Sequence, residues 1–332
     1  MSTALCIDEV SKSFPGKEQA AVDRASLCLE SGKILGLLGE SGCGKTTLLR
    51  IIAGFEQADT GTVEIAGELV YSASRNVPPS ERNVGMIFQD LALFPHLNVR
   101  QNILFGVSHK SREEQQSIAD KMLELTNLKG LEGRLPAALS GGQQQRLALG
   151  RCMATEPGLV LLDEPFSNLD VSLRNQMRRQ VSDLLRQSGT TAVLVTHDID
   201  DAIDICDLIA VMREGRILQL APFREMYHDP NCEYVARLSG PVVDLSKALQ
   251  QDRAGGGQRR RLIRPEKIRF RGSNPRLQAK VESCHFAGQS YVHVLRVGDA
   301  RFRLPSSEAL REGSQVRLFF HLDDLMDFEL GA

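Results

Sequence analysis

The sequence predicts an α/β protein with a mainly parallel sheet, followed by a smaller β-rich domain. Short, unbroken apolar runs at residues 34–38, 159–162 and 192–196 alternate with helical patterns. Strands that are covered on both faces have such unbroken runs, and parallel strands need long crossovers that are usually helical. A shift of composition near residue 240 indicates where the second domain follows.

Composition and charge narrow the class of protein. The 332 residues suffice for two domains, and 42% hydrophobic with 25% charged residues is typical of a globular chain with a core. A net charge of -2 gives no electrostatic case for a nucleic-acid partner. Seven cysteines without a CxxC pair predict reduced thiols in a cytosolic compartment. We expect no secretory signal, and no apolar run reaches the ~18–20 residues that cross a bilayer, so membrane work would need a partner.

A glycine-rich loop follows the first apolar strand and precedes a helical pattern that ends at Gly54. Its sequence, GESGCGKTT at 39–47, lets consecutive backbone N–H groups surround phosphates at a helix N-terminus. Lys45 is expected at the β- and γ-phosphate oxygens, Thr46 on Mg²⁺ and Thr47 at the α-phosphate. The predicted nucleotide contacts of this loop are Gly39, Ser41, Gly42, Cys43, Gly44, Lys45, Thr46 and Thr47.

The second apolar run ends in a pair of acidic residues. Asp163 occupies a position from which a carboxylate can hold Mg²⁺ beside a phosphate loop, and Glu164 is suited to act as general base on water. In an arbitrary protein, paired acids at a strand end are more often surface caps. Here the preceding apolar strand and the following Pro165 favour the catalytic interpretation.

The sequence LSGGQ at 139–143, followed by QQR, lies downstream of the phosphate loop and upstream of the acidic pair. This combination resembles the ATP-binding subunits of ABC transporters, and the resemblance extends from residue 4 to about 235. It implies an ATPase domain at 1–238 with a helical subdomain at about 90–157, bound ATP and Mg²⁺, and a head-to-tail homodimer. Each ATP then lies between one phosphate loop and the LSGGQ of the other subunit.

The resemblance also implies roles for single residues. Gln89 contacts Mg²⁺ and the attacking water, His197 contacts the γ-phosphate, and Asp170 belongs to a loop that crosses the dimer interface. Phe14 is expected to stack on adenine, with an ordinary core position as the alternative. The catalytic residues are thus expected to be Glu164, His197, Gln89 and Lys45. The expected metal ligands are Thr46, Gln89 and Asp163, and the expected contacts with the second ATP are Ser140, Gly141, Gly142, Gln143 and Asp170.

Two positions, Asn168 and Gly150, depart from the alanine that is usual in the family, and the change at Asn168 leaves the role of Asp170 intact. Gly150 stands in a helix where alanine is usual, which costs ~1 kcal/mol of helix stability. Cys43 has no family role, but it lies at a helix N-terminus beside Lys45, so we expect the pKa of its thiol to be lowered. The alternative is that the loop buries the sulfur against its own helix and leaves it inert.

The C-terminal part is expected to contain a linker at 239–258 and a small β-rich, OB-like domain at 259–332. Alternating residues around Gly298 predict a hairpin, and 316–320 predict another strand. We interpret the three arginines at 259–261 as a solvated linker end rather than a nucleic-acid site.

The tail resembles the accessory domain of ATPases that serve importers of sugars, polyamines, sulfate and ferric iron. Residues 53–57, the insert at 69–82 and the compact tail resemble ferric-iron importer ATPases most, with polyamine, thiamine, phosphonate, sulfate or sugar import as alternatives. Soluble ABC proteins of DNA repair or translation fit less well, because the chain has one ATPase domain and no long coiled coil. Expected partners are a second copy, an integral membrane permease that contacts residues 91–97 and, indirectly, a periplasmic or extracellular solute-binding protein. This places the chain at the cytoplasmic face of the inner membrane, as a peripheral subunit.

Overall fold

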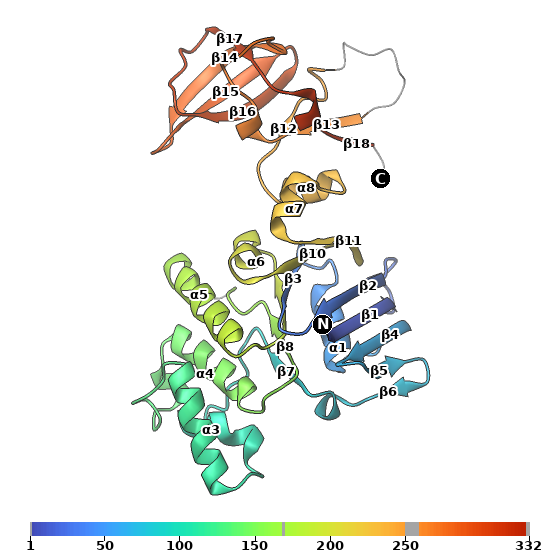
Figure 1. Ribbon diagram of the computed structural model, residues 1–332, viewed down its shortest axis with the longest axis vertical. Coiled ribbons are helices and arrows are strands. Elements are labelled where there is room, and N and C mark those ends of the chain that lie inside the picture. The colour runs from blue at the N-terminus through green and yellow to red at the C-terminus, as the bar shows by residue number, and fades with distance from the viewer. Residues whose placement is uncertain (1, 168–169, 250–258, 330–332) are drawn as a thin grey trace. The chain divides into compact units, whose positions relative to one another are not determined.

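The computed structural model describes residues 2–167, 170–249 and 259–329 (Figure 1). The chain divides into two compact units, Met1–Phe223 and Arg224–Ala332. Among the described residues, no helix has the length and apolar character that a membrane span requires.

The larger unit is built on a six-stranded sheet with the order β11-β10-β3-β9-β8-β7. Its strands are β3 (Ile34–Leu38), β7 (Val84–Ile87), β8 (Leu159–Asp163), β9 (Ala192–Thr196), β10 (Leu208–Arg213) and β11 (Arg216–Ala221). All are parallel except β11, and every residue of β3, β8 and β9 is buried. The predicted parallel sheet with unbroken apolar strands is therefore confirmed.

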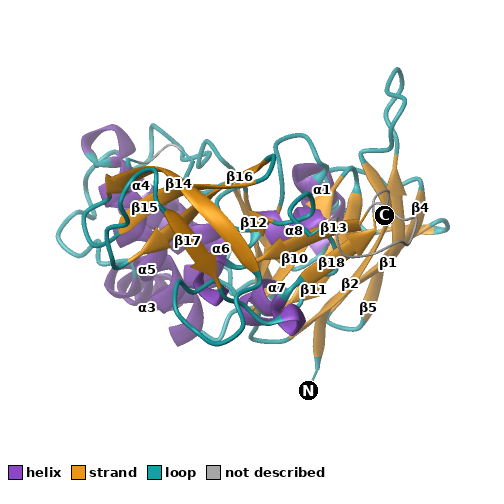
Figure 2. Ribbon diagram, turned by 90° about the horizontal axis from the view of Figure 1, so that it is seen from above, coloured by secondary structure: helices purple, strands orange, loops and turns teal. Residues whose placement is uncertain are grey.

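Helices and a second sheet complete this unit. The helices are α1 (Lys45–Ala53), α2 (Val99–Leu104), α3 (Arg112–Leu125), α4 (Gly141–Met153), α5 (Val171–Gln187) and α6 (Ile199–Ile205), with short 3-10 turns η1 (Pro79–Glu81), η2 (Phe105–Val107) and η3 (Pro136–Ala138). The antiparallel sheet has the order β2-β1-β4-β5-β6, with β1 (Thr3–Lys12), β2 (Val22–Glu30), β4 (Thr60–Ile65), β5 (Glu68–Ser72) and β6 (Arg75–Asn76). In Figures 1 and 2, α3, α4 and α5 lie together on one side of this unit, and the antiparallel sheet lies on the other.

The helical segment starts its helices with local capping signals. Asn98, Ser111 and Ser140 each accept a hydrogen bond from the backbone three residues on, and the residue at that position bonds back to the cap. Such capping boxes satisfy amide groups that the helix leaves without partners. The segment at about 90–157, predicted to be mostly helical, contains α2, α3 and α4.

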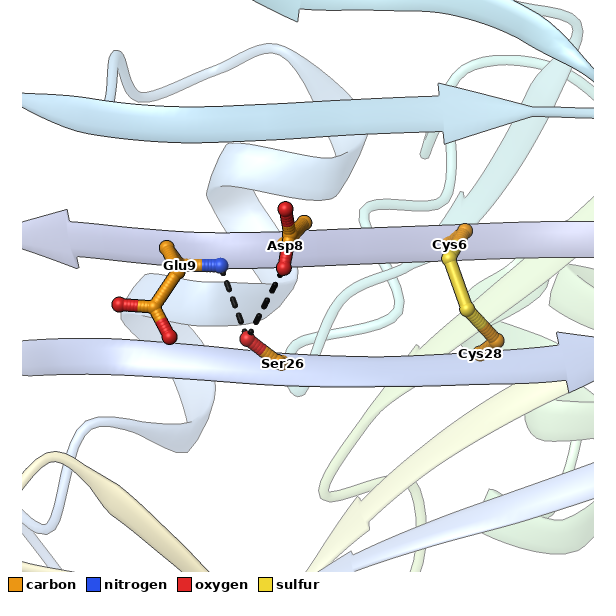
Figure 3. Close-up of a disulfide and its surroundings, with 5 residues drawn as sticks. All are labelled: Cys6, Asp8, Glu9, Ser26 and Cys28. Atoms are coloured by element: carbon orange, nitrogen blue, oxygen red, sulfur yellow. Dashed lines mark hydrogen bonds between the residues drawn. A yellow bond between two sulfur atoms is a disulfide. The ribbon is translucent and has the colours of Figure 1, made fainter.

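A disulfide joins Cys6 and Cys28, so the expectation that all seven cysteines are reduced is wrong for this pair (Figure 3). The two residues face each other across antiparallel β1 and β2, with 4.1 Å between their Cα atoms. Next to them, Ser26 Oγ accepts a hydrogen bond from the Glu9 amide at 2.8 Å and donates to the Asp8 carboxylate at 3.5 Å. Pairing register, which spacing along the chain does not reveal, brings the two sulfurs together.

The smaller unit contains two antiparallel sheets, with the orders β12-β13-β18 and β16-β15-β14-β17. Its elements are α7 (Phe223–His228), α8 (Glu233–Leu238), β12 (Val243–Asp244), β13 (Arg259–Ile263), η5 (Pro265–Lys267), β14 (Leu277–Phe286), β15 (Tyr291–Val297), β16 (Ala300–Ser306), β17 (Gln315–Leu318), η6 (Leu322–Asp324) and β18 (Met326–Glu329). The hairpin predicted around Gly298 is β15–β16. The prediction of a β-rich C-terminal domain is confirmed.

The larger unit ends at Phe223, fifteen residues before the boundary predicted at 238. One cause is Arg264, a buried residue whose guanidinium donates to the carbonyl of Ala236 at 2.9 Å and to that of Gly240 at 3.0 Å. This joins α8 to the β-rich core. The predicted linker is also partly structured, because Val243 and Leu245 are buried in that core. Residues 250–258 of the predicted linker lie outside the described residues.

The interpretation of residues 259–261 as a solvated linker end is wrong. These arginines form part of β13, which pairs with β18. Arg261 lies 3.4 Å from the Asp327 carboxylate, and Arg259 lies 3.8 Å from that of Glu329. Acids on β18 therefore pair with Arg259 and Arg261, whereas Arg260 pairs with Glu233 and Asp244.

Candidate active site

The phosphate loop connects β3 to α1 in the larger unit. Gly44 is the N-cap of α1 and has a φ of 108°, and a Cβ there would lie 1.9 Å from the Ala21 carbonyl oxygen. Gly42 has a φ of 84° and no atom within 4 Å of the position of a Cβ. Both positions thus favour glycine by conformation, and Gly44 also by close packing, whereas Gly42 leaves open space beside an exposed Ser41.

Lys45 is buried, with 4% of its surface exposed, and it spans the loop. Its Nζ donates to the carbonyl oxygens of Gly39 at 2.7 Å and Glu40 at 2.8 Å. The first turn of α1 contains no acidic residue of its own, so the positive end of the helix is available to an anion. An ammonium group, free N-terminal amides and a half-buried Thr47 hydroxyl together suit a polyphosphate.

A hydroxyl and a carboxylate meet beside the loop. Thr46 Oγ1 donates to Asp163 Oδ1 at 3.0 Å, from the start of α1 to the end of β8. Burial raises the pKa of Asp163, and the hydrogen bond from Thr46 and the charge of Arg50 oppose this rise. Hard oxygen donors of this kind fit Mg²⁺, which typically takes one or two protein ligands together with phosphate oxygens.

The next acid, Glu164, contacts the histidine at the neighbouring strand end. Glu164 Oε2 lies 3.2 Å from His197 Nδ1, and the Glu164 amide donates to the Val195 carbonyl at 3.1 Å. Because β8 and β9 are adjacent and parallel, their carboxyl ends place both side chains at one edge. Glu164 has a φ of 45°, a left-handed conformation that proteins retain mainly at turns and functional sites.

Gln89 reaches the same loop from the end of β7. Its Nε2 donates to Ser167 Oγ at 3.3 Å, and Ser167 Oγ donates to the Glu164 carbonyl at 3.0 Å. From α4, Gln145 Nε2 donates to the Pro165 carbonyl at 2.9 Å. The loop after Glu164 is thus bonded to β7 and to α4. Sequence reasoning did not find the roles of Ser167 and Gln145, which only contacts across the fold reveal.

A buried charge network behind His197 was also missed. Arg178, on α5, donates through Nη2 to Asp198 Oδ2 at 2.8 Å and through Nε to Asp201. Thr196 Oγ1 donates to the other oxygen of Asp201 at 2.6 Å. Burial raises the pKa of Asp201, while Thr196 and Arg178 oppose the rise. The only signal in the sequence is a group of acids just after His197.

The LSGGQ segment begins α4. Ser140 Oγ accepts from the Gln143 amide at 3.4 Å, and Gln143 Oε1 accepts from the Ser140 amide at 2.9 Å. Ser140 and Gly141 are exposed, and Gly142 packs closely, because a Cβ there would lie 3.1 Å from Met177 Sδ. This leaves a serine and the amides of a helix N-terminus at the surface.

Asp170 is the N-cap of α5 and accepts from the Leu173 amide at 2.9 Å. Residues 168 and 169 of the same predicted interface loop lie outside the described residues. Phe14 is half-buried, with Lys12 Nζ 5.3 Å from its ring centroid. Its stacking on adenine stays a prediction.

The expected lowering of the Cys43 pKa is wrong. Cys43 is buried, and burial raises the pKa of its thiol. Lys45 Nζ, 3.8 Å from the sulfur, acts in the opposite direction with a smaller effect. The cost of removing a thiolate from water therefore outweighs the helix terminus and the nearby cation, as the alternative interpretation expected.

Comparison with known proteins decides the family. Residues 22–167 match the family model described as ABC transporter, and residues 262–328 match the TOBE domain. The chain is 40% identical over 343 aligned residues to the Fe(3+) ions import ATP-binding protein FbpC of Pseudomonas fluorescens, covering 95% of both chains. The chain belongs to the ABC transporter family. It is an ATP-binding, ATP-hydrolysing subunit of that family with a C-terminal TOBE domain.

Other relatives of this ABC ATPase agree with the assignment. It is 36% identical over 334 residues to the spermidine/putrescine import ATP-binding protein PotA of Nitratidesulfovibrio vulgaris, covering 91% of this chain and 89% of that one. A solved dimeric ATP-binding cassette in a post-hydrolysis state, bound to ADP and Pi, matches with a TM-score of 0.58. That match has 27% identity and covers 66% of this chain and 98% of the other.

Proposed function

We propose that this chain hydrolyses ATP to drive a membrane importer whose cargo is ferric iron. The observation that carries the catalytic part is the meeting of two side-chain pairs beside the phosphate loop, the hydrogen-bonded Thr46–Asp163 and the contacting Glu164–His197. The Fe(3+) import relatives, which match along nearly the whole chain, support the cargo.

The residues divide the chemistry among them. Lys45 and the amide groups at the start of α1 hold the phosphates, because both carry positive charge toward an anion. Thr46 and Asp163 would hold Mg²⁺ with Gln89 nearby, and the bound ion would neutralise phosphate charge. Glu164 accepts a proton from the attacking water, and His197, 3.2 Å from its carboxylate, helps to orient it.

A second copy of the chain completes each site in this proposal. Ser140 and the first amides of α4 form an anion-binding helix terminus at the surface, on a different element from the phosphate loop. We assign them to the ATP bound by the partner, with Asp170 at the interface between the subunits. The solved dimeric cassette with ADP and Pi supports this arrangement.

Glu164→Gln tests the catalytic assignment. The variant should bind MgATP and hydrolyse it ~10²–10⁴-fold more slowly, the range expected for loss of a general base. Gel filtration with MgATP should then show a stable dimer, which Ser140→Arg in the same background should abolish. Glu156→Gln is the matched control, because Glu156 is an exposed acid in the same unit that pairs with the exposed Lys121. Turnover of Glu164→Gln equal to that of the control would contradict the assignment.

The surface after Gln89 fits a permease. The rings of Phe94 and Phe105 lie 4.2 Å apart, and those of Phe55 and Phe88 lie 5.8 Å apart. Phe55 and Phe105 are 56% and 54% exposed, which is unusual for phenylalanine in a monomer. We assign the surface around Phe94 and Phe105 to a short helix of an integral membrane permease. The subunit then acts at the cytoplasmic face of the inner membrane, with a solute-binding protein on the opposite side.

The match to PotA makes polyamine import the second candidate cargo. Uptake of radiolabelled iron and of radiolabelled putrescine in a deletion strain separates the two. Loss of iron uptake with normal putrescine uptake supports iron, and the reverse result supports polyamine import while leaving the ATPase assignment intact. Complementation with Glu164→Gln should fail and with Glu156→Gln should succeed, which ties transport to hydrolysis.

A further inference from the structure

The chain makes an unusual turn directly after Gln89. Leu91 has a φ of 61° and the next residue, Ala92, has a φ of 45°. Two consecutive non-glycine residues in the left-handed region are unfavourable, and such conformations persist only where surrounding contacts hold them. Within the turn, the Leu91 amide donates a hydrogen bond to the Phe88 carbonyl at 2.9 Å.

Arg151, on α4, contacts the carbonyl oxygens of this turn. Its Nη1 donates to the Ala92 carbonyl at 2.6 Å, and its Nη2 donates to the Leu91 carbonyl at 3.1 Å. The guanidinium carbon also lies 5.2 Å from the ring centroid of Phe94. One side chain therefore bonds both strained residues and contacts an aromatic ring of the apolar surface. Burial lowers the pKa of Arg151, which is consistent with a guanidinium enclosed by these groups.

We propose that Arg151 is a positioning residue for Gln89, holding the left-handed turn that places Gln89 beside the Glu164 loop. Gln89 is two residues before Leu91, and its amide reaches Ser167, which is bonded to Glu164. Without the guanidinium, the Leu91–Ala92 turn relaxes toward ordinary backbone angles and Gln89 moves with it. The inference rests on the proposed ATPase function, in which the position of Gln89 affects hydrolysis and leaves ATP binding to the phosphate loop.

Arg151→Ala and Arg146→Ala form a matched pair of variants. Arg146 is also on α4, and its guanidinium also donates to two backbone carbonyls, those of Thr126 and Asn127, at 3.2 and 3.3 Å. Burial lowers its pKa as it does that of Arg151. Both variants lose comparable contacts, but only Arg151→Ala releases the turn after Gln89. We expect Arg151→Ala to lower kcat by about 10- to 100-fold with unchanged ATP affinity, the scale of a small misplacement of a reacting group.

Hydrogen exchange gives a readout that does not depend on hydrolysis. Amides of residues 86–97 should exchange faster in Arg151→Ala than in wild type, and Arg146→Ala should leave them unchanged. If the wild-type protein fails to hydrolyse ATP, the proposed function fails, and this measurement still tests Arg151. Equal exchange at 86–97 and equal kcat in the two variants would overturn the proposal.

Ala92→Gly provides a rescue test. Ala92 is exposed, so replacing it by glycine removes one methyl group and relieves the left-handed strain. In the Arg151→Ala background it should recover at least about threefold in kcat, because glycine adopts this turn without support. Arg151→Lys, which keeps the charge with a less suitable geometry, should lie between wild type and Arg151→Ala. No recovery by Ala92→Gly would overturn the proposal.

Discussion

Arg178→Met isolates the energetic role of the charge network behind His197. Arg178 and Asp201 are each 4% exposed, and the guanidinium is the cation bonded to the Asp201 carboxylate. Methionine keeps most of the volume but leaves Asp201 with the Thr196 hydroxyl. Removing one partner of a buried ion pair destabilises by ~3–5 kcal/mol. For a unit of this size that corresponds to a fall in Tm of roughly 6–20 °C.

The loss should depend on pH, and its sign follows from Asp201. Burial already raises the pKa of Asp201, and loss of Arg178 raises it further, because the folded state then disfavours the ionised carboxylate. The free energy of unfolding of the variant therefore falls as the pH rises from the unfolded-state pKa of an aspartate to this raised pKa, and the loss is absent below both. Arg178→Met should therefore be destabilised more at pH 7.5 than at pH 5, relative to wild type at each pH.

Urea unfolding of wild type, Arg178→Met and Arg178→Met/Asp201→Asn at both pH values tests this. Asn cannot ionise, so the double variant should recover much of the loss at pH 7.5 and show little pH dependence. Arg186→Met is the control, because Arg186 lies on the same helix but pairs with Asp207 from a half-exposed position and should cost about 1 kcal/mol. A loss that is equal at both pH values, or that the second substitution does not reduce, would refute the buried-charge explanation.

Three further results are expected. Asp163→Asn should abolish hydrolysis. It should also raise the stability of the nucleotide-free protein by ~0.5–2 kcal/mol at pH 7.5 in urea unfolding, because burial raises the pKa of Asp163 and the folded protein disfavours its ionised form. This gain in stability should shrink as the pH falls. Gly150→Ala should add ~1 kcal/mol of stability in the same assay only together with Thr126→Ser, because its Cβ would lie 3.0 Å from the Thr126 methyl. Brief maleimide labelling mapped by mass spectrometry should leave buried Cys43 unmodified while half-buried Cys232 reacts; equal labelling would contradict the assigned burial.

The sequence predicted those parts of the site that lie at the ends of regular elements. Asp163 and His197 each follow a run of five or fewer apolar residues, and parallel pairing of β8 and β9 necessarily brings their ends together. Lys45 likewise follows from strand, loop and helix in order. In these cases local pattern and chain order determine the three-dimensional neighbour.

Contacts that depend on packing or register between distant segments could not be predicted in this way. Cys6 and Cys28 meet because of the pairing register of β1 and β2, and the burial of Cys43 reverses the direction of its pKa shift. The turn at Leu91 has no glycine or asparagine to announce it, and its support comes from Arg151, sixty residues away. The sequence of the turn alone would argue against its left-handed backbone.

The same long-range contacts explain how nucleotide chemistry and the apolar surface can communicate. Helix α4 begins at Ser140, bonds the Glu164 loop through Gln145, and holds the turn after Gln89 through Arg151. A helix is stiff along its axis, so a displacement of its Ser140 end must either carry both attachments with it or break their hydrogen bonds. Either outcome changes the position of Gln89 relative to Glu164 and the environment of Phe94, which Arg151 also contacts. Occupation of the Ser140 terminus and occupation of the aromatic surface should therefore influence each other's affinity reciprocally, as linkage requires.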